Sequence, residues 1–226
     1  MEHIHETYNK NMTEIGRLWK FQVVLRDRPD FRRNLEVLNK SGIVLLIACW
    51  ESFVEGLASE AFNFLLTNAI DHKVFSTKVL THASKTFWDS KDERGVWSLA
   101  DDGWKTLLAS HKDNTLKEYL GNFNTPRPRQ VDTLFETLIG LKNFSSHWHW
   151  KGMNSDRAKK KLDELVSLRG SIAHRVAASK VVTERGFHSH AVFITRLGLV
   201  ASNTVRSFVQ TRVGKYPWNV IKLKWD

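Results

Sequence analysis

The feature that most constrains the fold is a long helical pattern that runs from about Phe31 to Asn68. Between Ile43 and Leu66, apolar residues occupy nearly every side of this predicted helix. A helix that is apolar all round requires neighbours on all its faces. We therefore expect this helix to lie at the centre of a bundle.

Apolar residues recur at helical spacing along most of the chain, and long alternating strand patterns are missing. The spacing predicts further helices over about 5–25, 130–141, 155–176 and 190–213. Asn154 or Ser155 can cap the helix that begins near 155. The tail from Tyr216 to Trp225 fits either a short strand or an aromatic clasp over the core. The pattern as a whole predicts an all-α fold, an up-and-down helical bundle.

Residues 71–130 are expected to form an inserted helical subdomain. Short apolar segments there are broken near 89–91 and 101–103. Pro126 and Pro128 close the region, because prolines disfavour a helix and keep their neighbours extended. A chain of 226 residues is long enough for one domain with a real core, so we expect a single domain over 1–226 that contains this insertion.

Composition points to a polyanionic partner and to the cytoplasm. The formal charge is +10, and basic surface favours encounters with phosphate backbones. The single cysteine, Cys49, lies in an apolar run and is expected to be a buried core residue in a reducing compartment. The N-terminus has no basic region followed by an apolar stretch, and the apolar run from Gly42 to Trp50 is too short to cross a bilayer, so we expect no membrane association.

The segment from Leu168 to Arg175 carries the residues with the clearest chemistry. His174 can exchange a proton near neutral pH with a ribose 2′-hydroxyl or a leaving 5′-oxygen. Arg169 can bind a phosphate that gains negative charge in the transition state. Together these residue types suit RNA cleavage without a metal ion or other cofactor.

This segment resembles the R-x4-6-H signature of the HEPN superfamily of helical ribonucleases, and the helix around Leu45–Leu57 looks like the second helix of the RiboL-PSP type. The resemblance covers roughly 35–70 and 130–212. It implies a homodimer whose cleft lies at the interface, with RNA as substrate. It also implies a role in bacterial phage defence or a toxin-antitoxin system, with an antitoxin or another defence protein as a possible partner. Gly170 departs from the family, in which Asn, Asp or His often follows the arginine.

Helical geometry separates the two motif residues. Five residues at about 100° each place Arg169 and His174 about 140° apart around the helix axis. Either the long arginine reaches around the helix, or a twofold dimer brings together residues from two chains.

Other polar residues could support the motif. Glu51 emerges from a largely apolar face and needs a paired cation, for which Arg169 or Arg175 is a candidate. The resemblance also places a polar or acidic residue of the second helix beside the motif; Glu51 matches that place, with Glu55 as the runner-up. Ser171 and Glu51 are expected to orient the RNA or the arginine. The alternative for Glu51 is a glutamate at the rim of the bundle that is paired with a surface lysine.

Two further groups of residues bear on RNA binding. Arg157, Lys159, Lys160 and Lys161 precede the motif on the same helix and could track phosphates, although a plain solvated face explains them nearly as well. In His147-Trp148-His149-Trp150 the histidines are two residues apart and have no nearby acidic or cysteine partner, so aromatic packing or base stacking is favoured over a metal site. His188 and His190 are interpreted in the same way.

The sequence therefore supports two functions. In the first, the protein is a metal-independent endoribonuclease in which His174 is the general base or acid and Arg169 stabilises the transition state. In the second, the protein is a non-catalytic binding module. The same cleft at the dimer interface holds RNA or a partner protein, and Gly170 marks lost catalysis. A purely structural adaptor would leave the basic charge unexplained.

Overall fold

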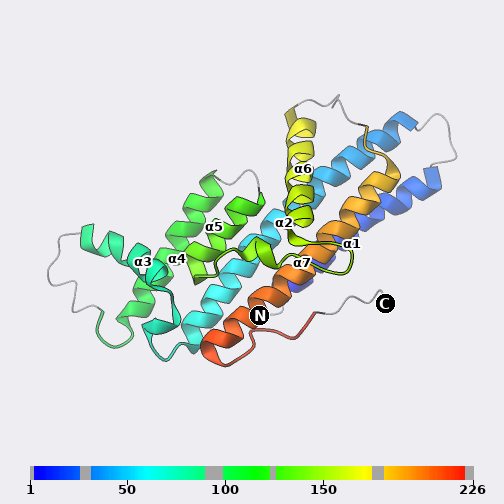
Figure 1. Cartoon of the computed structure of the whole chain (residues 1–226). Helices are drawn as coiled ribbons and strands as arrows, with labels where there is room; N and C mark the ends of the chain where they lie inside the picture. The colour runs from blue at the N-terminus through cyan, green and yellow to red at the C-terminus, as the bar shows by residue number, and fades with distance from the viewer. Residues whose placement is uncertain (1–2, 26–31, 90–98, 123–125, 175–180, 222–226) are drawn as a thin grey trace.

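The long helix α2 (Arg32–Asn68) is the axis around which the other helices are arranged in the computed structural model (Figure 1). The structure describes residues 3–25, 32–89, 99–122, 126–174 and 181–221. Helices α1 (His3–Leu25) and α7 (Glu184–Val213) run alongside α2 and pack against it. The prediction of a central second helix is confirmed.

Three further helices, α4, α5 and α6, also pack on α2. Helices α5 (Pro128–Ile139) and α6 (Ser155–His174) both pack on α2, and the short 3-10 helix η4 (Phe144–His147) connects them. The expected insertion contains a 3-10 turn, η2 (His72–Val74), and the helices α3 (Thr77–Asp89) and α4 (Gly103–Asn122). Helix α4 contacts α2 and α5, while α3 packs on α4 and α5.

The all-α helical bundle is confirmed. The part of the chain that the structure describes holds seven α-helices and no strand, apart from one isolated bridge between Trp150 and Met153. The helices lie within a few residues of their predicted limits, with one exception. Helix α7 begins at Glu184, six residues before the predicted start at 190.

The early start of α7 has a local cause. Thr183 caps the helix, because its side-chain oxygen accepts a hydrogen bond from the Gly186 amide at 3.1 Å. Phe187 is then buried against Gly42 of α2, where a Cβ would overlap the phenylalanine ring. Burial of this aromatic side chain favours the extra turn of helix.

Large apolar side chains of α2 form the centre of the core. Trp50 is fully buried and meets the Trp148 ring edge to face at 5.8 Å. Cys49 is also buried and free, as predicted. The segment Asn34–Asn68 is long and apolar enough to cross a membrane by length and composition alone, but 56% of its most apolar window is buried within the bundle.

The C-terminal tail packs as a clasp, without a strand over its described residues. The backbone N–H and C=O of Ile221 are both hydrogen-bonded to the Asn203 side-chain amide, at 3.2 and 3.0 Å. Arg206 donates to the Trp218 carbonyl at 2.8 Å and lies over the Tyr216 ring at 3.6 Å. These contacts hold the tail along α7.

Candidate functional site

Helix α6, which carries the motif, is fixed by its cap and by its apolar face. The Asn154 side-chain oxygen accepts a hydrogen bond from the Arg157 amide at 2.9 Å, so Asn154 is the cap. Leu162, Leu165 and Val166 are buried, and α6 packs on α2 through this face. The helix therefore presents fixed faces to α2 and to solvent.

Arg169 lies on the apolar face of α6 that packs on α2. It follows Leu162 by seven residues and Leu165 by four, and so shares their side of the helix. Its side chain is half-buried, and its Nε is a buried atom with no hydrogen-bond partner among the described residues. A guanidinium N–H is thus left without an acceptor in the part of the chain that the structure describes.

Glu51 of α2 carries the carboxyl group on which the charge of Arg169 acts. Burial raises the pKa of Glu51, and the positive charge of Arg169 partly opposes that rise. The structure describes no direct ion pair between the two groups. The charge of Arg169 therefore acts on Glu51 across the α2–α6 interface, and the pairing of the two side chains stays a prediction.

Glu55, one turn after Glu51, completes a small cluster of charged groups. Burial and the neighbouring Glu51 charge raise the pKa of Glu55 to about 7. Its Oε1 is buried and has no hydrogen-bond partner in the described part of the chain. Near neutral pH the two carboxyls therefore carry less than two full negative charges beside Arg169.

His174 is the last described residue of α6, and it is exposed. Because it lies about 140° around the helix from Arg169, the two side chains do not project from one face. A single chain thus separates the two motif groups, as the spacing predicted. Arg175, the other supporting candidate, lies outside the described residues.

His174 shares its side of α6 with Asp163, Ser167 and Gly170. These positions are eleven, seven and four residues before it, which is the spacing of one helical stripe. Ser171, predicted to orient the RNA or the arginine, is half-buried and lies about 160° from Arg169 around the axis. Its position does not bring it beside the arginine of the same chain.

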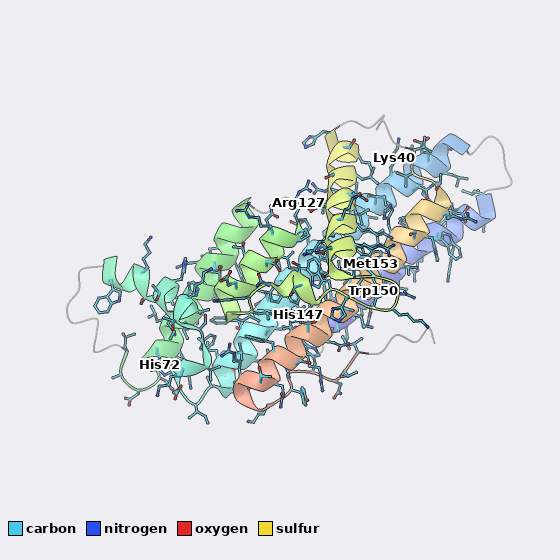
Figure 2. All side chains as sticks on the ribbon, viewed as in Figure 1. Lys40, His72, Arg127, His147, Trp150 and Met153 are labelled. Atoms are coloured by element: carbon cyan, nitrogen blue, oxygen red, sulfur yellow. The ribbon has the colours of Figure 1, made fainter. Side chains whose placement is uncertain are left out.

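Arg127 is held on the stripe of α6 that carries His174. Its Nη1 donates to the Asp163 carboxylate at 3.1 Å and to the Asp163 carbonyl at 3.3 Å, and its Nη2 donates to the Ser167 hydroxyl at 3.0 Å. The side chain is 34% exposed. Figure 2 shows Arg127 between α5 and α6.

The backbone on both sides of Arg127 fixes its position. Pro128 begins α5 and keeps Arg127 in an extended conformation, with φ −76° and ψ 159°. Pro126 is buried, and its carbonyl accepts a hydrogen bond from the Trp50 indole at 3.3 Å. The guanidinium is therefore anchored at the backbone and at α6. In the sequence Arg127 is only a basic residue between two prolines, and no local pattern there specifies a contact 36 residues away.

The basic residues early in α6 do not share one face. Arg157 and Lys160 are exposed, while Lys159 pairs with Asp156 at 2.7 Å. Lys161 turns to α7, where its Nζ lies 3.3 Å from the Ser189 hydroxyl and 5.0 Å from the Phe193 ring centroid. Burial lowers the pKa of Lys161. The phosphate-tracking role of all four residues stays a prediction.

The two histidine pairs differ in how far their side chains are buried. His147 and His149 are exposed, while Trp148 between them is buried in the core. His188 lies against the Trp19 ring at 5.3 Å. Burial first, and then the charge of Lys161, lower the pKa of His190 to about 4. Over the described ranges, no three His, Cys, Asp or Glu side chains form a group that could hold a metal ion.

Comparison with known families gives one result. The family model described as RiboL-PSP-HEPN matches residues 8–199, a span that includes α2 and the motif on α6. No curated protein and no solved structure matches the chain. The resemblance found in the motif and in the second helix is thus confirmed by a match along most of the chain.

Proposed function

The chain belongs to the RiboL-PSP-HEPN family, and from this we propose that it is a metal-independent endoribonuclease. The observation that carries the proposal is the placement of the motif on α6. His174 is exposed at the helix end, and among the described residues the buried N–H of Arg169 Nε has no acceptor.

In the proposed reaction the RNA supplies its own nucleophile. His174 takes the proton of a ribose 2′-hydroxyl, and the 2′-oxygen forms a bond to the adjacent phosphorus. The P–O5′ bond breaks, and a protonated His174 gives a proton to the leaving 5′-oxygen. Arg169 stabilises the charge that develops on the phosphate oxygens. The products are a 2′,3′-cyclic phosphate and a 5′-hydroxyl.

We propose that the active form is a homodimer, because the two motif residues of one chain point to different sides of α6. A face of α2 with exposed side chains supports this. Val37 and Leu45 on it are 58% and 47% exposed, and Ser41, Ala48 and Ser52 on the same face are exposed as well. These five positions fall within about 80° around the helix. Glu51 borders them, so a second copy on this face would approach Arg169.

The cellular setting is part of the proposal. We propose cytoplasmic action on RNA, without a membrane, in bacterial phage defence or in a toxin-antitoxin system. An antitoxin or another defence protein would then be a partner. Family membership and the +10 charge support these points.

One observation favours a second function, a non-catalytic module that binds RNA or a protein. Arg169 is half-buried and already interacts with the Glu51 charge, and Gly170 offers no polar side chain beside it. In this alternative the dimer binds RNA or a protein without cutting it.

The test is cleavage of single-stranded RNA by the purified protein in excess EDTA. We expect cleavage to persist and to leave a 2′,3′-cyclic phosphate. His174→Ala should lower the rate by about 10²- to 10⁴-fold, because a general acid-base is lost. Its fold should be retained, since the side chain is exposed. RNA binding without any cleavage by the parent protein would favour the non-catalytic alternative.

A matched control is His147→Ala. His147 is also exposed, but it lies on η4 and not on α6. The proposal expects this variant to cut RNA at the parent rate. Equal loss of cleavage in both histidine variants would argue against a specific role of His174.

A further inference from the structure

We propose that Arg127, Gly170 and His174 form a seat for an RNA phosphodiester on the outer stripe of α6. This inference rests on the proposed function and adds to it a second cation, separate from the motif arginine. A cation near His174 is needed because Arg169 faces α2 and does not share a face with His174 of its own chain.

Arg127 supplies the cation on the side of His174. It is bonded to Asp163 and Ser167, which lie on the same stripe as His174. The Nε–H and one Nη2 hydrogen of its guanidinium have no acceptor among the described residues. These remaining donors can bind phosphate oxygens, as arginine commonly does.

The contacts of Arg127 fix its orientation in advance. The Ser167 hydroxyl donates to the Asp163 carbonyl at 2.8 Å while it accepts from Arg127, so the three groups form one network. Asp163 neutralises part of the arginine charge, and the pair is partly exposed. Binding at this seat would therefore depend on directed hydrogen bonds more than on net charge.

Gly170 provides the space for the phosphate. It lies between Ser167 and His174 on the stripe, and a Cβ built on it would meet no atom of the described residues within 4 Å. Ser167 and His174 are about 10 Å apart along the axis, and Gly170 lies one turn before His174, on the side toward which helical side chains generally lean. The glycine, which departs from the family pattern, then leaves space for a phosphate between the cation of Arg127 and the imidazole of His174.

A larger side chain at position 170 tests the seat, because it would occupy the space proposed for the phosphate. Gly170→Leu should lower RNA cleavage at least about tenfold and weaken the binding of an uncleavable 2′-O-methyl RNA. Its melting temperature should not fall, because leucine is a better helix former than glycine and the site is open. Gly16→Leu is the matched control. Gly16 lies within α1, and its Cβ would likewise meet no atom within 4 Å, so we expect parent-like binding and cleavage.

A second pair of variants tests the cation. Arg127→Gln should weaken binding of the uncleavable RNA by about tenfold, since charge-assisted hydrogen bonds to phosphate are lost. Arg129→Gln removes the same charge from an exposed residue of the same segment and should change binding by less than about twofold.

The outcomes separate this inference from the proposed function. If the parent cuts RNA and Gly170→Leu cuts equally well, the seat is wrong while the ribonuclease proposal stands. Equal losses in Arg127→Gln and Arg129→Gln would overturn the role of Arg127 in the seat. A parent protein that neither binds nor cuts RNA would overturn the proposed function and the seat with it.

Discussion

Glu55 shows how a single side chain can make the stability of this bundle depend on pH. Its pKa is raised from its ordinary value of 4.5 to about 7, so between these values the folded state holds a proton that the unfolded state releases. Stability falls with rising pH wherever the folded state binds more protons. The contribution of Glu55 is therefore full below about pH 4.5 and is lost as the pH rises through 7.

We expect Glu55→Gln to remove this dependence. The free energy of unfolding of the variant, compared with that of the parent, should rise between pH 5 and pH 8, because the glutamine never ionises. Urea unfolding at both pH values measures this. Glu14→Gln, a change at an exposed residue paired with Arg17, should show no such trend. A constant difference between parent and Glu55→Gln would contradict the raised pKa.

Arg169→Lys tests whether the shape of the arginine matters as well as its charge. Lysine keeps the positive charge near Glu51 but lacks the planar guanidinium that binds two phosphate oxygens. We expect cleavage to fall by about 10²-fold while RNA binding changes little, because the loss falls on the transition state. Parent-like cleavage by this variant would show that the charge alone suffices. Arg17→Lys, on the surface of α1, is the control.

At the scale of elements, the exposed face of α2 has a direct consequence for assembly. Ala48 is exposed at the middle of that face, so Ala48→Arg should leave the monomer fold intact and place a charge inside the proposed interface. We expect light scattering to show a dimer for the parent and a monomer for the variant, together with loss of cleavage. A parent that is monomeric at micromolar concentration would contradict the composite site.

The sequence predicted the helices better than the contacts between them. Apolar periodicity located α2 and α6 within a few residues, because burial of one face leaves a repeating pattern. It also predicted the separation of Arg169 from His174, which follows from helix geometry alone. The early turn of α7 was missed because it depends on the packing of Phe187 on Gly42, far away in the chain.

The features of the site that the sequence did not predict also depend on residues far away in the chain. The turn of Lys161 toward α7 depends on Ser189 and Phe193, and the anchoring of Arg127 depends on Asp163 and Ser167. Neither contact leaves a local signal in the sequence. Glu55 was recognised only as the runner-up to Glu51, since its raised pKa depends on burial between packed helices.

At the scale of the whole molecule, the excess of basic residues favours RNA through many weak contacts. The charge of +10 is spread over several helices, and the basic side chains of α6 point to different sides. Positive charge on several sides of the molecule raises the rate of encounter with a phosphate backbone. It also adds affinity that does not depend on base sequence.

Salt dependence measures this contribution. We expect the binding of uncleavable single-stranded RNA to weaken as salt rises, and each lysine that neutralises a phosphate to contribute about 0.7 to the slope of log K against log salt. Lys160→Gln should lower that slope, because Lys160 is exposed, whereas Lys161→Gln should change it little, since Lys161 is held against Ser189 and Phe193. Neither change should move the cleavage position. Binding that is constant from low to moderate salt would remove the electrostatic basis for RNA as the partner. An equal change of the slope in Lys160→Gln and Lys161→Gln would show that the Lys161 side chain leaves α7 to contact the RNA.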